Sequence, residues 1–148
     1  MNLLIHGLLL TISSSLYAAL SKIIIVVYYN TIFEDDPEIN TLSKIMDLAL
    51  ELSENKDSDL DNIHRLGEGW VGEETLGIAL YCSLRYQNDF SKGIIAAVNH
   101  NGDSDSTGAV TGNILGALYG YDAIENKWKD NLELIDVIMK VSDDLSKI

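Results

Sequence analysis

Apolar residues recur at the spacing of an α-helix through most of the chain. Steps of three and four place them on one helix face over residues 39–52, and the same spacing returns at residues 76–84 and 134–145. A short apolar run at residues 94–98 predicts one more helix. Neither an alternating strand pattern nor a tandem repeat occurs, so the sequence predicts an all-α fold, a compact multi-helix bundle with residues 1–148 as a single domain.

Polar segments separate these predicted helices. Pro37 disfavours helix in the residue before it and marks a first break. Residues 53–62 are charged and polar, which predicts a loop. Three glycines surround Trp70 in residues 67–72, and we expect Trp70 to anchor the core or this turn-rich connection.

The stretch of residues 1–29 is strongly apolar, and a signal peptide, a membrane span or a buried helix could account for it. No cationic residue precedes the apolar run, which disfavours a signal peptide. Lys22 lies near its centre of mass and would cost about 3 kcal/mol in a bilayer, which disfavours a membrane span. We therefore expect a buried core helix and no association with a membrane.

The charge balance and the cysteine content exclude several classes of protein. Ten Lys and Arg stand against 23 Asp and Glu, a net charge of -13, whereas nucleic-acid binders need clustered cations. A lone cysteine, Cys82, excludes an internal disulfide framework and a cysteine-rich zinc site, and its apolar surroundings predict a small buried hydrophobe. We expect no nucleic-acid partner, and a single thiol suits a reducing, cytoplasmic location.

Four glycines follow one another at steps of four, at positions 108, 112, 116 and 120. On a helix this spacing makes a stripe without side chains. Each glycine inside a helix lowers the stability of the helix by about 1 kcal/mol relative to alanine, so the stripe needs a compensating contact. We expect close packing against a neighbouring helix, with the apolar N-terminal helix as that neighbour.

Acidic and hydroxyl side chains precede this stripe, among them Asp103, Asp105, Ser106 and Thr107. In a turn before a helix, two carboxylates about 6 Å apart repel by roughly 3 kcal/mol at an effective dielectric of 20. A hard cation such as Mg²⁺, Mn²⁺ or Ca²⁺ reverses that sign. Capping of the helix is the alternative, but it requires only one such residue. An EF-hand is excluded, because Ile114 stands where a glutamate is required.

Residues 99–108 read Asn-His-Asn-Gly-Asp-Ser-Asp-Ser-Thr-Gly and lead into the glycine stripe. This segment resembles the C-terminal metal motif of the ADP-ribosylglycohydrolases, also called the dinitrogenase-reductase-activating glycohydrolase family. The similarity extends upstream to residues 69–74 and downstream to residues 121–124 and Trp128. Near the N-terminus, His6 resembles the first histidine of the family's Thr-His-x-His-Pro pattern, although leucines replace the second histidine and the proline.

The resemblance implies a two-cation centre of Mg²⁺ or Mn²⁺ at the N-terminus of the glycine-striped helix. It implies that Asp103, Asp105 and Ser106 are metal ligands, and that His6 is a substrate-binding residue. It also implies metal-dependent hydrolysis of an N- or O-glycosidic linkage between ADP-ribose and a protein, with ADP-ribose or an ADP-ribosylated protein as partner. No catalytic residue is identified, because the family's acid and remaining ligands come from N-terminal motifs that include a Thr-Asp-Asp triplet. This chain has no such triplet.

The chain therefore resembles the C-terminal part of the enzyme, and we expect it to be inactive unless an N-terminal half is supplied. The alternative is a non-catalytic remnant or binding module of the same fold. Glu68, Glu73 and Glu74 are candidate acids, but surface charges at a helix start are the favoured interpretation. We expect His100 to face solvent in its loop. An uncovered apolar N-terminal helix predicts a homo-oligomer or a complementing N-terminal fragment as partner.

Overall fold

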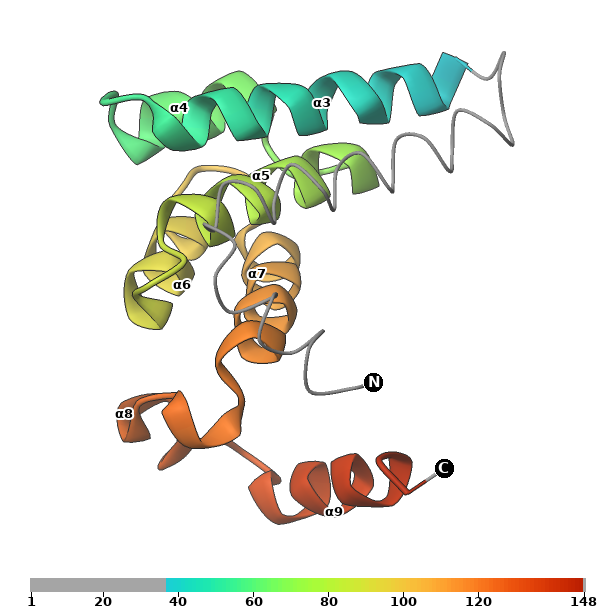
Figure 1. The fold of residues 1–148 in the computed structure, drawn as a ribbon, viewed down its shortest axis with the longest axis vertical. Coiled ribbons are helices and arrows are strands. Elements are labelled where there is room, and N and C mark those ends of the chain that lie inside the picture. Colours follow the sequence, from blue (N-terminus) through green and yellow to red (C-terminus); the bar gives the residue numbers. More distant parts are fainter. Residues whose placement is uncertain (1–36, 148) are drawn as a thin grey trace, which may run out of the picture.

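The computed structural model describes residues 37–147, and within that range the chain is helical without any strand (Figure 1). The prediction of an all-α fold is confirmed for these residues. His6 and the apolar stretch at residues 1–29 lie outside the described residues. The elements are α3 (Pro37–Glu54), α4 (Asp59–Leu66), α5 (Gly72–Arg85), α6 (Phe90–Val98), α7 (Ser104–Tyr119), the 3-10 turn η1 (Tyr121–Ala123), α8 (Asn126–Lys129) and α9 (Ile135–Leu145).

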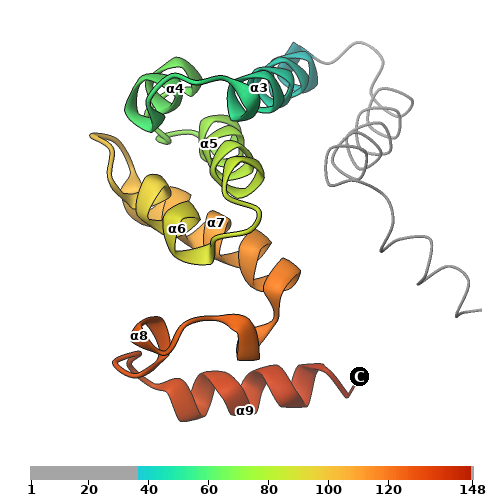
Figure 2. The ribbon, with the colours of Figure 1, turned by 60° about the vertical axis from the view of Figure 1, so that its left-hand side comes forward.

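Helix α5 lies at the centre of the arrangement. It packs against α3 and α4 on one side and against α6 and α7 on the other (Figures 1 and 2). Helices α8 and α9 lie beyond the C-terminal end of α7 (Figures 1 and 2). The hydroxyl of Ser91 donates to Glu125 and accepts from the indole Nε1 of Trp128 at 2.7 Å, which ties α8 to α6.

The prediction of a loop over residues 53–62 is wrong in part. Helix α3 continues to Glu54, and α4 begins at Asp59. The side chain of Ser58 accepts a hydrogen bond from the Asp61 amide at 3.2 Å and so satisfies one free N–H of the first turn. The charges that resembled a loop therefore form the end of one helix and the capped start of the next.

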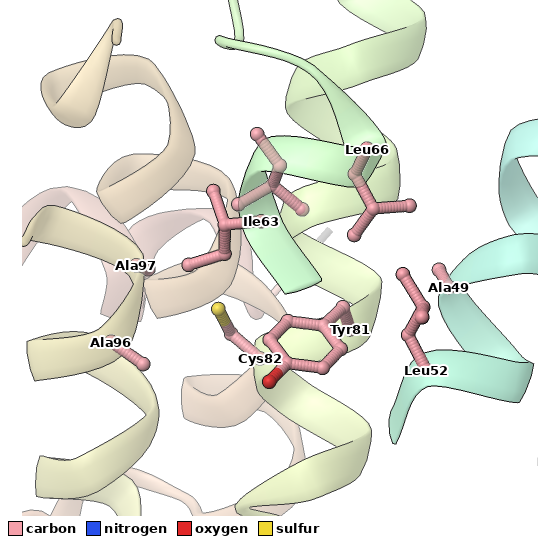
Figure 3. Close-up of a cluster of buried hydrophobic side chains, with 9 residues drawn as sticks. Ala49, Leu52, Ile63, Leu66, Tyr81, Cys82, Ala96 and Ala97 are labelled. Atoms are coloured by element: carbon pink, nitrogen blue, oxygen red, sulfur yellow. The ribbon is translucent and has the colours of Figure 1, made fainter. Parts of the chain in front are cut away.

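The apolar faces of α3, α4, α5 and α6 meet in one core. Figure 3 shows Tyr81 and Cys82 of α5 among the buried side chains of the other three helices. The predicted burial of Cys82 is confirmed, since its exposure is 0%. The buried members are Ala49, Leu52, Ile63, Leu66, Ile78, Tyr81, Cys82, Ala96 and Ala97.

A polar cluster at the edge of this core joins α4 to α5. The Asp59 carboxylate accepts hydrogen bonds from the hydroxyls of Tyr81 and Tyr86, each at 2.6 Å. Arg85 lies 3.1 Å from the same carboxylate through Nε and donates to the backbone carbonyl of Asn55 at 2.9 Å. Buried hydroxyls need such partners, so Asp59 fixes how the two helices meet.

The protonation of the core predicts how stability depends on pH. Burial raises the pKa of the Cys82 thiol to about 12, and burial and the Asp59 hydrogen bond raise the pKa of Tyr81. The folded state thus holds these protons more tightly than the unfolded chain, where a cysteine ionises near 9.0. Linkage predicts that this contribution to the free energy of unfolding is complete below that value and is lost as the pH rises.

Urea unfolding at about pH 8 and about pH 10.5 will measure this loss. We expect a smaller loss in Cys82→Ala, because the thiol contribution is absent from that variant. Equal losses in the two proteins would contradict the assignment to Cys82.

Helix α9 confirms the predicted C-terminal helix, but its apolar face is exposed. The side chains of Leu134, Val137, Ile138, Val141 and Leu145 are 47 to 67% exposed, and no residue of α9 is buried. None of the helices between Pro37 and Leu145 is long and apolar enough to cross a membrane.

Candidate metal centre

The glycine stripe of α7 lets α6 approach closely. A Cβ atom at Gly108 would lie 2.6 Å from Cγ1 of Val98, and one at Gly112 would lie 3.7 Å from Cδ1 of Ile94. The neighbour seen in the described part of the chain is thus α6, and the N-terminal helix that we expected lies outside the described residues. Gly120 has another role, since it ends α7 with a φ of +74°, a conformation that favours glycine.

Asp103 stands at the position that precedes the first residue of α7. Its side chain makes no capping hydrogen bond with the amides of the first turn. The side chains of Asp105 and Ser106 hold the pKa of Asp103 below its ordinary value. The Asp103 carboxylate, the Asp105 side chain and the Ser106 hydroxyl therefore lie near one another at this helix start.

These three side chains form at most part of a metal site. Among residues 37–147, no three side chains of His, Cys, Asp and Glu come together closely enough to hold a metal ion. A cavity of about 280 Å³ beside the turn is lined by α4 and by loop residues that include Glu68, His100 and Gly102. Asp103 and Asp105 do not line that cavity.

His100 holds the turn before α7 from within. Its Nδ1 accepts a hydrogen bond from the Gly102 amide at 3.1 Å, so the ring proton of the neutral histidine lies on Nε2. Nε2 donates to the Thr107 hydroxyl at 2.9 Å, and that hydroxyl donates to the Ala97 carbonyl at 2.7 Å. The expectation of a solvent-facing His100 is wrong, because the ring connects the turn to the first turn of α7 and to α6.

The loop of residues 67–69 holds the turn from the other side. The Asp103 amide donates to the Glu68 carbonyl at 2.7 Å. The backbones approach so closely that a Cβ atom on Gly102 would lie 1.8 Å from that carbonyl oxygen. Gly69 is buried against Thr107, where a Cβ atom would lie 2.9 Å from Cγ2. The position of the Asp103 backbone is therefore set by a loop distant in sequence.

Trp70 does not anchor the core, which was one of the two roles that we expected for it. Its side chain is 66% exposed, and its Nε1 donates to a carboxylate oxygen of Glu68 at 3.0 Å. Glu74 is likewise more than a surface charge, because its Oε2 accepts from the Glu68 and Gly69 amides. These partners lie across turns, where periodicity gives no signal.

Two matched substitutions test how much the Thr107 hydroxyl contributes to the free energy of unfolding. Thr107→Val keeps the shape but leaves the Ala97 carbonyl and His100 Nε2 without their partner, and we expect a loss of about 2 kcal/mol. Thr111 is equally buried, but its hydroxyl donates only to the Thr107 carbonyl within the same helix. Thr111→Val should therefore lose under about 1 kcal/mol in urea unfolding. Equal losses would contradict the role given to Thr107.

Three comparisons place the chain among known proteins. The chain is 27% identical to ADP-ribosylhydrolase ARH3 of Homo sapiens over 110 residues, which are 68% of this chain and 30% of that protein. It is 35% identical to ADP-ribosylarginine hydrolase Tri1 of Serratia proteamaculans over 98 residues, 66% of this chain and 26% of that protein. Over 45 residues it is 42% identical to the ADP-ribosyl-dinitrogen reductase glycohydrolase of Rhodospirillum rubrum, 30% of this chain and 15% of that protein.

The aligned part thus spans less than a third of the length of these relatives. No solved structure matches the chain. The family model for ADP-ribosylglycohydrolases matches residues 1–148. Since that match covers the whole chain, the protein belongs to the ADP-ribosylglycohydrolase family.

Proposed function

We propose that Asp103, Asp105 and Ser106 are ligands of Mg²⁺ or Mn²⁺ in an ADP-ribosylglycohydrolase centre. The observation that carries the proposal is the placement of these three side chains at the start of α7, on a turn fixed by His100 and by the Glu68 carbonyl. Two carboxylates and a hydroxyl are hard oxygen donors, which suit these cations. The donor chemistry of the described residues therefore fits the group, although the ligand set is partial.

A cation bound there supplies Lewis-acid polarisation and orients the ribose hydroxyls of the substrate. The chain itself contributes the start of α7, where the partial positive charge of a helix N-terminus favours an anionic diphosphate. That contribution matters because a net charge of -13 otherwise repels such a ligand. Asp103 and Asp105 hold the cation, and Thr107 and His100 keep the turn in position.

The proposed reaction is hydrolysis of an N- or O-glycosidic linkage between ADP-ribose and a protein side chain. The Serratia proteamaculans relative is named an ADP-ribosylarginine hydrolase, which supports an N-glycosidic linkage. This sequence lacks the Thr-Asp-Asp triplet of the family, so we propose that an N-terminal half must supply the remaining ligands and the acid. The partial ligand set among residues 37–147 supports the same view.

A non-catalytic binding module is the second candidate. A ligand set that is only partial among residues 37–147 agrees equally well with this candidate. This candidate predicts no turnover with any cation or complement.

An assay of ADP-ribose release from a protein that is ADP-ribosylated on arginine distinguishes the two candidate functions. The chain is assayed with Mg²⁺ or Mn²⁺, alone and together with the N-terminal part of the Serratia proteamaculans relative. We expect release only in the mixture, and its loss in Asp103→Asn but not in the control Asp136→Asn. Asp136 is a suitable control because it lies at the start of α9 as Asp103 lies at the start of α7. No release from the mixture, with the relative's own two halves active, would favour the binding module.

A further inference from the structure

Glu74 lies in the first turn of α5 and folds back over the loop that precedes this helix. Its Oε2 accepts hydrogen bonds from two successive backbone amides, those of Glu68 at 3.1 Å and Gly69 at 3.0 Å. Hydrogen bonds to a carboxylate are shorter and stronger than those between neutral groups. One side chain thus fixes the N–H edge of the loop.

The opposite edge of the same loop contacts the backbone of one candidate metal ligand, Asp103. The Glu68 carbonyl accepts from the Asp103 amide at 2.7 Å, and the Gly69 carbonyl accepts from the Thr75 hydroxyl at 2.8 Å. A continuous path therefore runs from the Glu74 carboxylate through the Glu68 peptide to the backbone of Asp103. No part of this path depends on the side chain of Asp103 itself.

The adjacent acid provides a contrast. Glu73 shares the first turn of α5, and its side chain makes no hydrogen bond or ion pair with the described part of the chain, whereas the side chain of Glu74 makes two hydrogen bonds. The two residues offer the helix N-terminus the same charge, so any difference between them reflects the loop contacts and not the helix dipole.

We propose that Glu74 is a positioning residue for the cation site and acts on Asp103 through the backbone of Glu68. The inference rests on the proposed function of Asp103 as a ligand. Without the carboxylate, the Glu68 and Gly69 amides lose their acceptor, and the Glu68 carbonyl no longer holds the Asp103 amide in place. Ligands must keep their positions within about 0.5 Å, and loss of an outer partner typically weakens metal binding roughly 10- to 100-fold.

The test uses the full chain and the variants Glu74→Ala, Glu74→Gln and Glu73→Ala. Mn²⁺ affinity is measured by electron paramagnetic resonance, and exchange of the Glu68, Gly69 and Asp103 amides is measured by NMR without metal. We expect Glu74→Ala to raise the Mn²⁺ dissociation constant roughly 10- to 100-fold and to speed exchange at all three amides. Glu74→Gln retains a carbonyl acceptor and should rescue most of both effects, while Glu73→Ala should match the wild type.

The outcomes separate this inference from the proposed function. Unchanged exchange in Glu74→Ala, or faster exchange with unchanged Mn²⁺ affinity, would overturn the positioning role. If the wild type does not bind Mn²⁺, the proposed function fails, while the amide exchange still decides whether Glu74 fixes Asp103. If Glu74→Ala does not fold, Glu74→Asp replaces it, because the shorter side chain keeps the charge but does not reach the two amides.

Discussion

Replacing Gly102 by alanine will lower the free energy of unfolding by about 3 kcal/mol and abolish Mn²⁺ binding. The added Cβ would lie 1.8 Å from the carbonyl oxygen of Glu68 and 2.6 Å from its carbon. These are backbone atoms, so no side-chain rotation relieves the overlap. The two loops must separate, which breaks the hydrogen bond of 2.7 Å between the Asp103 amide and the Glu68 carbonyl.

Gly112→Ala is the matched control for this substitution. Its Cβ would make an ordinary contact of 3.7 Å with Cδ1 of Ile94, and alanine favours the helix over glycine by about 1 kcal/mol. Urea unfolding followed by circular dichroism should show a stabilised control and a destabilised Gly102→Ala. A Gly102→Ala variant as stable as the wild type would contradict the close approach of the two loops.

Replacing Asp59 by alanine should also lower the free energy of unfolding by about 3 kcal/mol. The carboxylate is the hydrogen-bond acceptor for Tyr81 and Tyr86 and the ionic partner of Arg85. Tyr81 is fully buried, so its hydroxyl would lose the acceptor at 2.6 Å without gaining water. An unsatisfied buried donor costs about 1 to 3 kcal/mol, and the two remaining contacts add to this.

Asp61→Ala tests whether charge alone explains the effect. Asp61 lies two residues further along the first turn of α4, and its carboxylate accepts from the exposed hydroxyl of Ser58 at 2.6 Å. We expect that variant to lose under about 1 kcal/mol. Equal losses from Asp59→Ala and Asp61→Ala would show that Asp59 stabilises the protein through its charge at the start of α4 and not through the tyrosine cluster.

Periodicity predicted most of the helices because burial of one face produces it. The run at residues 76–84 lies within α5, and the run at residues 94–98 forms the second half of α6. Residues 53–62 were predicted as a loop because their pattern is charged, and the Ser58 cap that starts α4 within them depends on local hydrogen bonding. Local chemistry outweighed average polarity at this point.

The sequence predicted the motif of the candidate site but not the residues that hold the motif in place. Asp103 and Asp105 were identified from their spacing before a glycine-rich helix; they lie at the start of α7, and their role as metal ligands stays a prediction. His100 and Glu74 were assigned to the surface because their partners lie across turns, in the Gly102 and Gly69 amides. Such contacts come from the tertiary arrangement of the loops and leave no periodic signal in the sequence.

The glycine stripe likewise predicted a contact without identifying the partner. Its spacing predicted a close helix neighbour, and the short contact at Gly108 supports this, whereas the contact at Gly112 is an ordinary one. The identity of the neighbour depended on how α6 and α7 pair, which the spacing does not specify. Val98 and Ile94 of α6 provide the contact.

Titration of Mn²⁺ into the full chain by calorimetry tests the central claim most directly. The wild type is compared with Asp103→Asn/Asp105→Asn and with the control Asp122→Asn/Asp136→Asn, which removes the same charge from two other exposed first-turn positions. The proposed centre predicts that the wild type and the control bind Mn²⁺ with equal affinity and that the Asp103→Asn/Asp105→Asn variant does not bind. Equal heats in all three proteins would contradict a cation site at the start of α7.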